Sequence, residues 1–178
     1  MAAGDLNFQD VATPTVRLPG EHAFEANGIK FTYTISGKGP LLVVQVPGWG
    51  VGASYLRHTL VSLEQYFSLL YFEPRGNGHS SRPENEEAMS SEHMAIDLEQ
   101  LRLHLGLQTL MLLGHSNGGC IALGYAARFP ERVSKLVLLD HQLMGFRDPE
   151  SWERFKRARI QDPVYGPALR SIRKNGDQ

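Results

Sequence analysis

One serine in this chain has neighbours that suit nucleophilic chemistry. The stretch Thr109–Ala127 reads TLMLLGHSNGGCIALGYAA and places Ser116 between Gly114 and Gly118. An apolar run of strand length precedes the serine, and a pattern of small residues typical of a helix follows it. A tight turn between a strand and a helix lifts a serine hydroxyl clear of the sheet and directs the helix N-terminus at the group it attacks. The spacing therefore predicts a serine placed for acyl transfer.

The segments that would position Ser116 alternate between strand and helix patterns. Apolar residues at helical spacing predict helices from about Ser54 and over residues 90–105, the latter ended by Gly106. A further amphipathic, basic helix is predicted over Pro149–Ile160. Continuous apolar runs predict three strands covered on both faces of a parallel sheet, at Leu41–Val46, Ser68–Phe72 and Val133–Leu139.

An antiparallel hairpin precedes these segments. Asn27-Gly28 is a strong two-residue turn signal between strand patterns at His22–Ala26 and Ile29–Ser36. A hairpin followed by strands that alternate with helices predicts an α/β fold, with a mostly parallel sheet and helices on both faces. In such sheets ligands bind at the carboxyl ends of the strands. The predicted strand ends carry Gly48-Trp49, Glu73, Ser116 and Asp140.

The chain is long enough for one domain with a substantial core and too short for two. We divide it into three parts. Residues 1–20 are predicted to form a loose N-terminal leader, and residues 21–140 the α/β core. Residues 141–178 are predicted to be the start of a cap or a C-terminal helical tail.

Composition argues against several classes of partner. The formal net charge of −1 gives no electrostatic case for nucleic acid or for an anionic membrane surface. No run reaches the ~18 apolar residues of a membrane span, and the first residues lack the pattern of a secretory signal. The lone cysteine, Cys120, is expected to be a buried structural thiol. We expect a cytoplasmic protein that holds no metal and no cofactor.

Several motifs in order make the chain resemble the α/β-hydrolase superfamily, in its serine-nucleophile branch. GHSNGG resembles the nucleophile elbow, VPGWG the oxyanion loop, and EPRGNGHS the acid-x-Arg-Gly-x-Gly-x-Ser loop. The resemblance implies Ser116 as the nucleophile and an oxyanion hole made by the backbone N–H groups of Trp49 and Asn117. It also implies that Gly114 and Gly118 let strand and helix approach closely. The Trp49 side chain would then line the acyl pocket, with a plug over the top of the sheet as the alternative.

The resemblance stops after the sixth predicted strand. The family normally has eight strands, with the acid after the seventh and the base histidine after the eighth, so we expect an incomplete α/β-hydrolase fold, truncated after strand six. Asp140 follows the sixth strand, where some members place the acid, and His141 beside it is the candidate base. A serine without a base is a poor nucleophile.

Two functions follow from this pattern. The first is a serine hydrolase acting on an ester, lactone, thioester or amide bond of a small molecule through Ser116. The alternative is a catalytically incomplete fragment or pseudoenzyme that binds a ligand or protein partner. The apolar last strand, SKLVLLD, would form an unprotected sheet edge, which predicts a homodimer through that edge.

Overall fold

The computed structural model describes residues 17–141, 148–164 and 166–167. Most of the predicted leader, residues 1–16, lies outside the described residues. The chain divides into two compact units, Met1–Gln142 and Leu143–Gln178, and each is described by itself.

The first two strands form the predicted hairpin, β1 (Gly20–Ala26) and β2 (Ile29–Gly37). Asn27 and Gly28 both have positive φ, 52° and 73°, as the two central residues of a tight hairpin turn require. Alternate residues of β2 are buried, which confirms the expected strand with one face toward a core.

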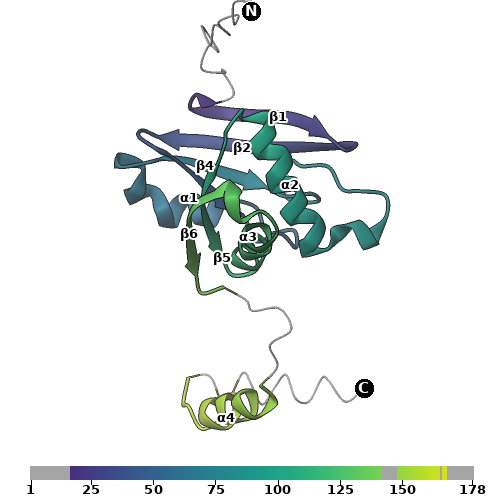
Figure 1. The fold of residues 1–178 in the computed structure, drawn as a ribbon. Coiled ribbons are helices and arrows are strands. Elements are labelled where there is room, and N and C mark those ends of the chain that lie inside the picture. Colours follow the sequence, from purple (N-terminus) through teal and green to yellow (C-terminus); the bar gives the residue numbers. More distant parts are fainter. Residues whose placement is uncertain (1–16, 142–147, 165, 168–178) are drawn as a thin grey trace, which may run out of the picture. The chain divides into compact units, whose positions relative to one another are not determined.

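The hairpin joins a six-stranded sheet in the order β1-β2-β4-β3-β5-β6 (Figure 1). Strand β2 is antiparallel to β4, whereas the β3–β4, β3–β5 and β5–β6 pairs are parallel. The predicted α/β class, with a mostly parallel sheet, is therefore confirmed. The remaining strands are β3 (Leu41–Gln45), β4 (Ser68–Glu73), β5 (Leu110–His115) and β6 (Val133–Leu139).

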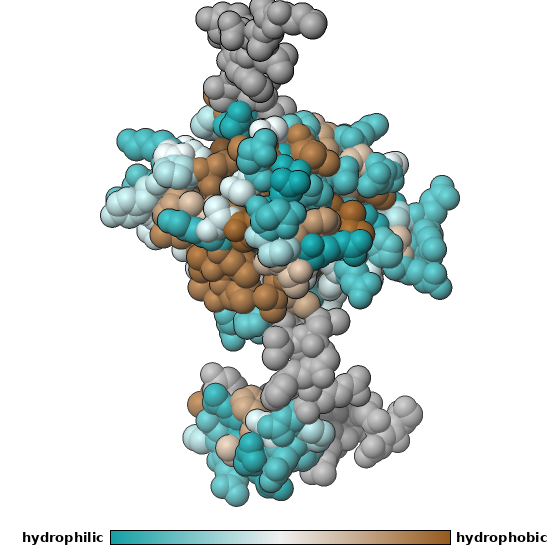
Figure 2. Space-filling model, viewed as in Figure 1, coloured by the Kyte–Doolittle hydropathy of each residue, from teal (hydrophilic) through white to brown (hydrophobic). Residues whose placement is uncertain are grey.

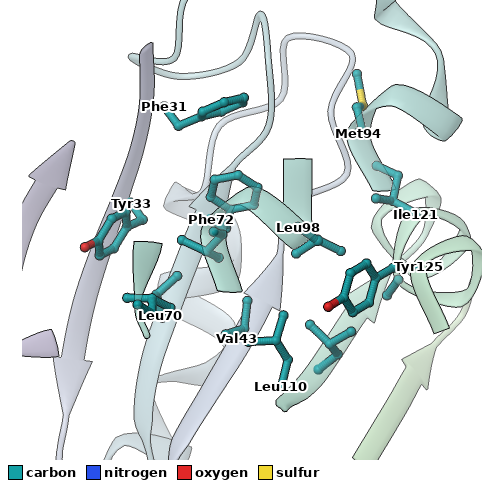
Figure 3. Close-up of a cluster of buried hydrophobic side chains, with 14 of the residues drawn as sticks. Phe31, Tyr33, Val43, Leu70, Phe72, Met94, Leu98, Leu110, Ile121 and Tyr125 are labelled. Carbon is teal, nitrogen blue, oxygen red and sulfur yellow. The ribbon is translucent and has the colours of Figure 1, made fainter. Parts of the chain in front are cut away.

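Helices cover the sheet on two sides and divide the core into two clusters. Helices α2 (Ser91–His104) and α3 (Asn117–Arg128) pack on one face, where aromatic and aliphatic side chains of β2, β4 and β5 meet them (Figure 3). On the other face, α1 (Ser54–Leu60) and the short helix η2 (Val61–Gln65) pack on β3 and β4. Two further short helices are η3 (Glu86–Met89) and η4 (Pro130–Arg132).

Helix α2 begins and ends as its sequence predicts. The Ser90 side chain accepts a hydrogen bond from the His93 N–H, which caps the first turn. Gly106 follows the helix with a φ of 64°, the left-handed conformation that ends many helices. The apolar stripe Met94, Leu98, Leu101 and Leu105 is fully buried.

The burial predicted for β6 on both faces is wrong, whereas the unprotected sheet edge predicted for the same strand is confirmed among the described residues. Among the described residues β6 pairs only with β5, on one side, so β6 is an edge strand. Helix α3 packs against one face of it, while Val137 and Leu139 are 42% and 38% exposed. Figure 2 shows an apolar area in the region where Figure 1 draws β6.

The second unit contains α4 (Pro149–Ile160), at the predicted position. The Asp148 side chain accepts a hydrogen bond from the Ser151 N–H over 2.9 Å, and Pro149 occupies the first helical position. Within the described ranges, every helix falls short of the length and apolar character that crossing a bilayer requires.

Candidate active site

Ser116 sits at the apex of a strained turn between β5 and α3. Its φ of 55° and ψ of −126° lie where L-residues with side chains are rarely found. The Ser116 N–H donates to the Leu139 carbonyl over 3.1 Å, and the Ser116 carbonyl accepts from the Gly119 N–H over 3.0 Å. The turn is thus held by the last residue of β6 and by the first turn of α3.

The glycines around Ser116 are required by close backbone contacts. A Cβ atom at Gly114 would lie 2.5 Å from the Gly118 carbonyl oxygen and from the Gly119 Cα. A Cβ at Gly118 would collide with the carbonyl oxygen of Gln45, the last residue of β3. These contacts bring the N-terminus of α3 against the carboxyl ends of two adjacent strands.

The oxyanion loop predicted at VPGWG (46–50) lies beside this turn, and in the structure the name oxyanion loop is given to Pro47–Val51. The Asn117 side-chain Nδ2 donates to the Pro47 carbonyl over 2.6 Å. Gly48, Trp49 and Gly50 all have positive φ, 86°, 59° and 75°, and the Val51 N–H donates to the Gly48 carbonyl over 3.2 Å. The loop is therefore a tight turn docked on the start of α3.

Trp49 points its side chain outward. It is 67% exposed, which rules out the plug over the top of the sheet. Among the described residues, neither the Trp49 N–H nor the Asn117 N–H has a hydrogen-bond acceptor.

The structure places Asp140 and His141 at the end of β6. Asp140 is exposed, with a φ of 43°, and the His141 backbone and Cβ lie against Gly119. Across residues 17–141, no hydrogen bond joins the Ser116 side chain to Asp140, to His141 or to another histidine. The predicted acid and base are near the elbow in the fold but do not engage Ser116 in this structure.

The other histidines of the core have different partners. The His115 ring is hydrogen-bonded to the Tyr55 hydroxyl over 2.9 Å. His79, 89% exposed in its side chain, lies 3.9 Å from the Glu73 carboxylate, and His93 bonds to Ser90.

Arg75 in the loop after β4 has a structural role. Its guanidinium donates to both carboxylate oxygens of Asp97 on α2 and to the Ala88 carbonyl. Arg75 therefore ties its glycine-rich loop to α2 and η3, and it does not face Ser116.

A cavity of about 560 Å³ is lined by residues of the hairpin, of the start of α1 and of the loop after β4. Its lining includes His22, Lys30, Arg57 and Glu73, and it contains no residue of the elbow or of α3. Within the described residues, no cluster of three or more His, Cys, Asp or Glu side chains is arranged to hold a metal.

The sequence comparison identifies the family. A family model described as alpha/beta hydrolase fold matches residues 42–167. The chain belongs to this family. The match includes the oxyanion loop, the Arg75 loop, the Ser116 elbow and β6, so the resemblance read from those motifs is confirmed.

Curated relatives match the same region. The chain is 39% identical over 104 residues to the mouse protein named (Lyso)-N-acylphosphatidylethanolamine lipase, covering 57% of this chain and 30% of that protein. It is 33% identical over 114 residues to human 1-acylglycerol-3-phosphate O-acyltransferase ABHD5, covering 63% and 32%. With human Serine hydrolase BPHL it shares 31% identity over 153 residues, covering 79% and 52%. The chain thus spans a third to about half of these relatives.

Solved structures share the fold. A bacterial membrane phospholipase A superposes with a TM-score of 0.65 and 27% identity, covering 80% of this chain and 46% of that one. Epoxide Hydrolase A from Mycobacterium thermoresistibile superposes with a TM-score of 0.64 and 26% identity, covering 82% and 46%. The aligned part of this chain therefore spans about half the length of these structures.

Proposed function

We propose that this chain carries the nucleophile and oxyanion hole of a serine hydrolase that cleaves an ester, lactone, thioester or amide bond. The observation that carries the proposal is the strained conformation of Ser116 at the β5–α3 junction, with the oxyanion loop hydrogen-bonded beside it. Residues held in such conformations cluster at functional sites.

The chemistry follows from these groups. The Ser116 Oγ attacks the carbonyl carbon, and the carbonyl oxygen takes up negative charge as the tetrahedral intermediate forms. The N–H groups of Trp49 and Asn117, together with the N-terminal end of α3, stabilise that charge. Collapse of the intermediate expels the alcohol, thiol or amine with a proton and leaves an acyl-serine, which water then hydrolyses to the acid.

The proton of Ser116 needs a base. We propose His141 for that role and Asp140 as its acid, on their position directly after β6 and on the packing of His141 against Gly119. Because neither is bonded to Ser116 here, the His141 ring would have to swing toward the hydroxyl when substrate binds. Removal of a triad base lowers turnover by several orders of magnitude, so His141→Ala tests this assignment directly.

The substrate class is supported by the apex residue and by its surroundings. A serine forms an acyl-enzyme with a carbonyl compound, so acyl substrates are favoured although some similar structures are named epoxide hydrolases. Trp49 and Val51, 67% and 46% exposed, offer apolar surface beside the elbow. Two relatives are named for reactions of acylated lipids. We therefore propose a small molecule with an apolar acyl group.

A fluorophosphonate probe tests the proposal. We expect covalent labelling of the folded chain, and loss of labelling in Ser116→Ala. Ser62→Ala is the control, because Ser62 is an exposed serine on η2 and is not part of the elbow or of the oxyanion loop. A folded chain that the probe does not label would contradict the proposal.

The second candidate is a binding protein without turnover. It is favoured by the absence, across the described core, of a histidine or aspartate bonded to Ser116. In that case an apolar ester analogue should raise the melting temperature equally in the parent chain and in Ser116→Ala, with no product formed.

A further inference from the structure

Two buried asparagines hold the oxyanion loop near its two ends. Asn117 and Asn77 are each 1% exposed, and each bonds to the backbone of Pro47–Val51. We propose that both are positioning residues, which fix the Trp49 N–H in the orientation needed to bind the oxyanion. This inference rests on the proposed function for its catalytic meaning, although the structural role can be measured without it.

The loop needs such support because its conformation is unfavourable. Trp49 and Gly50 are the central residues of a turn closed by the Val51 N–H and the Gly48 carbonyl, and both have positive φ. Glycine adopts that conformation readily, whereas a bulky residue such as tryptophan does so only when its surroundings enforce it. The exposed Trp49 side chain has little packing that could enforce its positive φ. Contacts to the backbone of the loop must therefore hold this conformation.

Asn117 holds the beginning of the loop. Its Nδ2 donates to the Pro47 carbonyl over 2.6 Å, while the Ser91 hydroxyl donates to its Oδ1 over 3.4 Å. The same residue supplies one of the two proposed oxyanion donors through its backbone N–H. One residue thus links the position of the loop to the position of the elbow.

Asn77 holds the other end of the loop. Its Oδ1 accepts from the Gly50 N–H over 2.5 Å, and its Nδ2 donates to the Arg75 carbonyl over 2.8 Å. Because Arg75 is paired with Asp97, the contact connects the loop to α2. Helix α2 also limits the loop at Gly48, since a Cβ there would lie 3.3 Å from the sulfur of Met94.

The two contacts flank Trp49 and leave its N–H unpaired. A donor that is already oriented before the reaction stabilises developing charge without reorganising, which is the main source of oxyanion-hole catalysis. A displacement of such a donor by about 1 Å can lower the rate about 100-fold. The asparagines therefore act through the loop and do not touch the reacting atoms.

We call Asn77 and Asn117 together the asparagine clamp. NMR relaxation of the Trp49 backbone amide tests whether this clamp holds the loop. In a Trp152→Phe background, labelling with ¹⁵N-tryptophan gives one backbone amide signal, that of Trp49. We expect an order parameter near 0.85 in this parent and below about 0.6 in Asn117→Leu and in Asn77→Ala. Asn85→Ala is the control, since Asn85 caps η3 at the surface and should leave the value unchanged.

A second readout separates this inference from the proposed function. If the parent is labelled by fluorophosphonate, both clamp variants should be labelled about tenfold more slowly or worse. Unchanged order parameters in both variants would overturn the clamp, whatever happens to labelling. A mobile loop in a chain that is never labelled would support the clamp and contradict the hydrolase. Far-UV circular dichroism checks folding. If only one of the two variants folds, the Trp49 order parameter of that variant is the test. Loss of fold in both variants would overturn a role confined to the loop.

Discussion

Arg75 and Asp97 form a buried ion pair with two hydrogen bonds. Nε donates to Oδ2 over 2.7 Å and Nη2 to Oδ1 over 2.5 Å, and the residues are 6% and 0% exposed. The pair joins the loop after β4 to the middle of α2. Since Asn77 in the same loop holds Gly50, the pair also supports the oxyanion loop from a distance.

Removing one partner of this pair should destabilise the protein strongly. Asp97→Ala leaves the Arg75 guanidinium buried without its counter-ion, and we expect a loss of about 3–5 kcal/mol in the free energy of unfolding. Urea unfolding followed by circular dichroism measures it. The control is Glu86→Ala, which breaks the exposed Arg82–Glu86 pair and should lose less than about 1 kcal/mol. Equal losses would show that burial does not set the strength of the Arg75–Asp97 pair.

Two glycines on α3 should respond oppositely to the same substitution. Gly118→Ala brings a methyl group into the Gln45 carbonyl, and we expect a loss of about 1–3 kcal/mol together with loss of probe labelling. Gly124→Ala meets only the Ala95 Cβ at 3.9 Å and should stabilise the helix by about 0.5–1 kcal/mol. Thermal melts and labelling of both variants check this, and a stable, labelled Gly118→Ala would contradict the contact.

The strained backbone conformation of Ser116 should lower the free energy of unfolding of the protein. Ser116→Gly relieves the positive φ, and we expect about 1 kcal/mol of added stability with complete loss of labelling. Ser116→Ala removes the same hydroxyl but keeps the Cβ, so it should lose labelling without the gain. Equal stability of the two variants, measured in urea, would show that the conformation is not strained.

Stability should fall on mild acidification because of His104. Its ring stacks on Phe24 at 4.4 Å and its Nε2 lies 3.1 Å from the Tyr33 hydroxyl. Burial, aided by the nearby His22, lowers the pKa of His104 below its usual value. Burial also raises the pKa of Tyr33 to about 12, so the hydroxyl that is hydrogen-bonded to the ring stays protonated.

The sign follows from proton binding. The unfolded chain binds the proton at a higher pH than the folded one, so the contribution of His104 is present above about pH 6.5 and is lost as pH falls through its folded pKa. We expect the free energy of unfolding to drop between pH 7.5 and 5.5, and to drop less in His104→Gln. His58→Gln, at an exposed position, should keep the full dependence. An unchanged pH dependence in His104→Gln would contradict the assignment.

The edge strand β6 should promote self-association. Its outer N–H and C=O groups have no partner within the described core, and Val137 and Leu139 flank them with apolar surface. We expect a concentration-dependent dimer in sedimentation experiments, weakened by Val137→Lys. The control is Val61→Lys, at another exposed valine far from β6 in the sequence. A monomer at all concentrations would exclude the dimer.

Local patterns predicted most elements of the fold. The hairpin, the apolar runs and the capped helix α2 each carry their signal within a few residues, so sequence was sufficient. The composition of SKLVLLD alone predicted a strand buried on both faces, because it is that of a central strand. Its place at the sheet edge was predicted only from the absence of a seventh strand pattern after it, since burial depends on which elements lie beside a strand. The strand order likewise arises from pairings between distant segments.

The elbow was predictable, but its supports were not. Ser116 and its glycines form a compact motif whose backbone needs are local. Asn77 and Asn117 look like ordinary turn residues in the sequence, and only the fold brings their side chains to Gly50 and Pro47. A polar residue within a glycine-rich turn beside a strand end was the only available hint.

The position of β3 has a consequence for how the chain folds. This five-residue strand lies between β4 and β5, and Val43 pairs with both Leu70 and Leu112. To form these pairs the chain must first close long loops, which costs conformational entropy before the strand contacts give any stabilisation. This order of events makes folding slow. During synthesis, one edge of β3 stays open until residues 110–115 have left the ribosome. A chaperone that shields the apolar β3 during this interval should therefore raise the yield of folded protein.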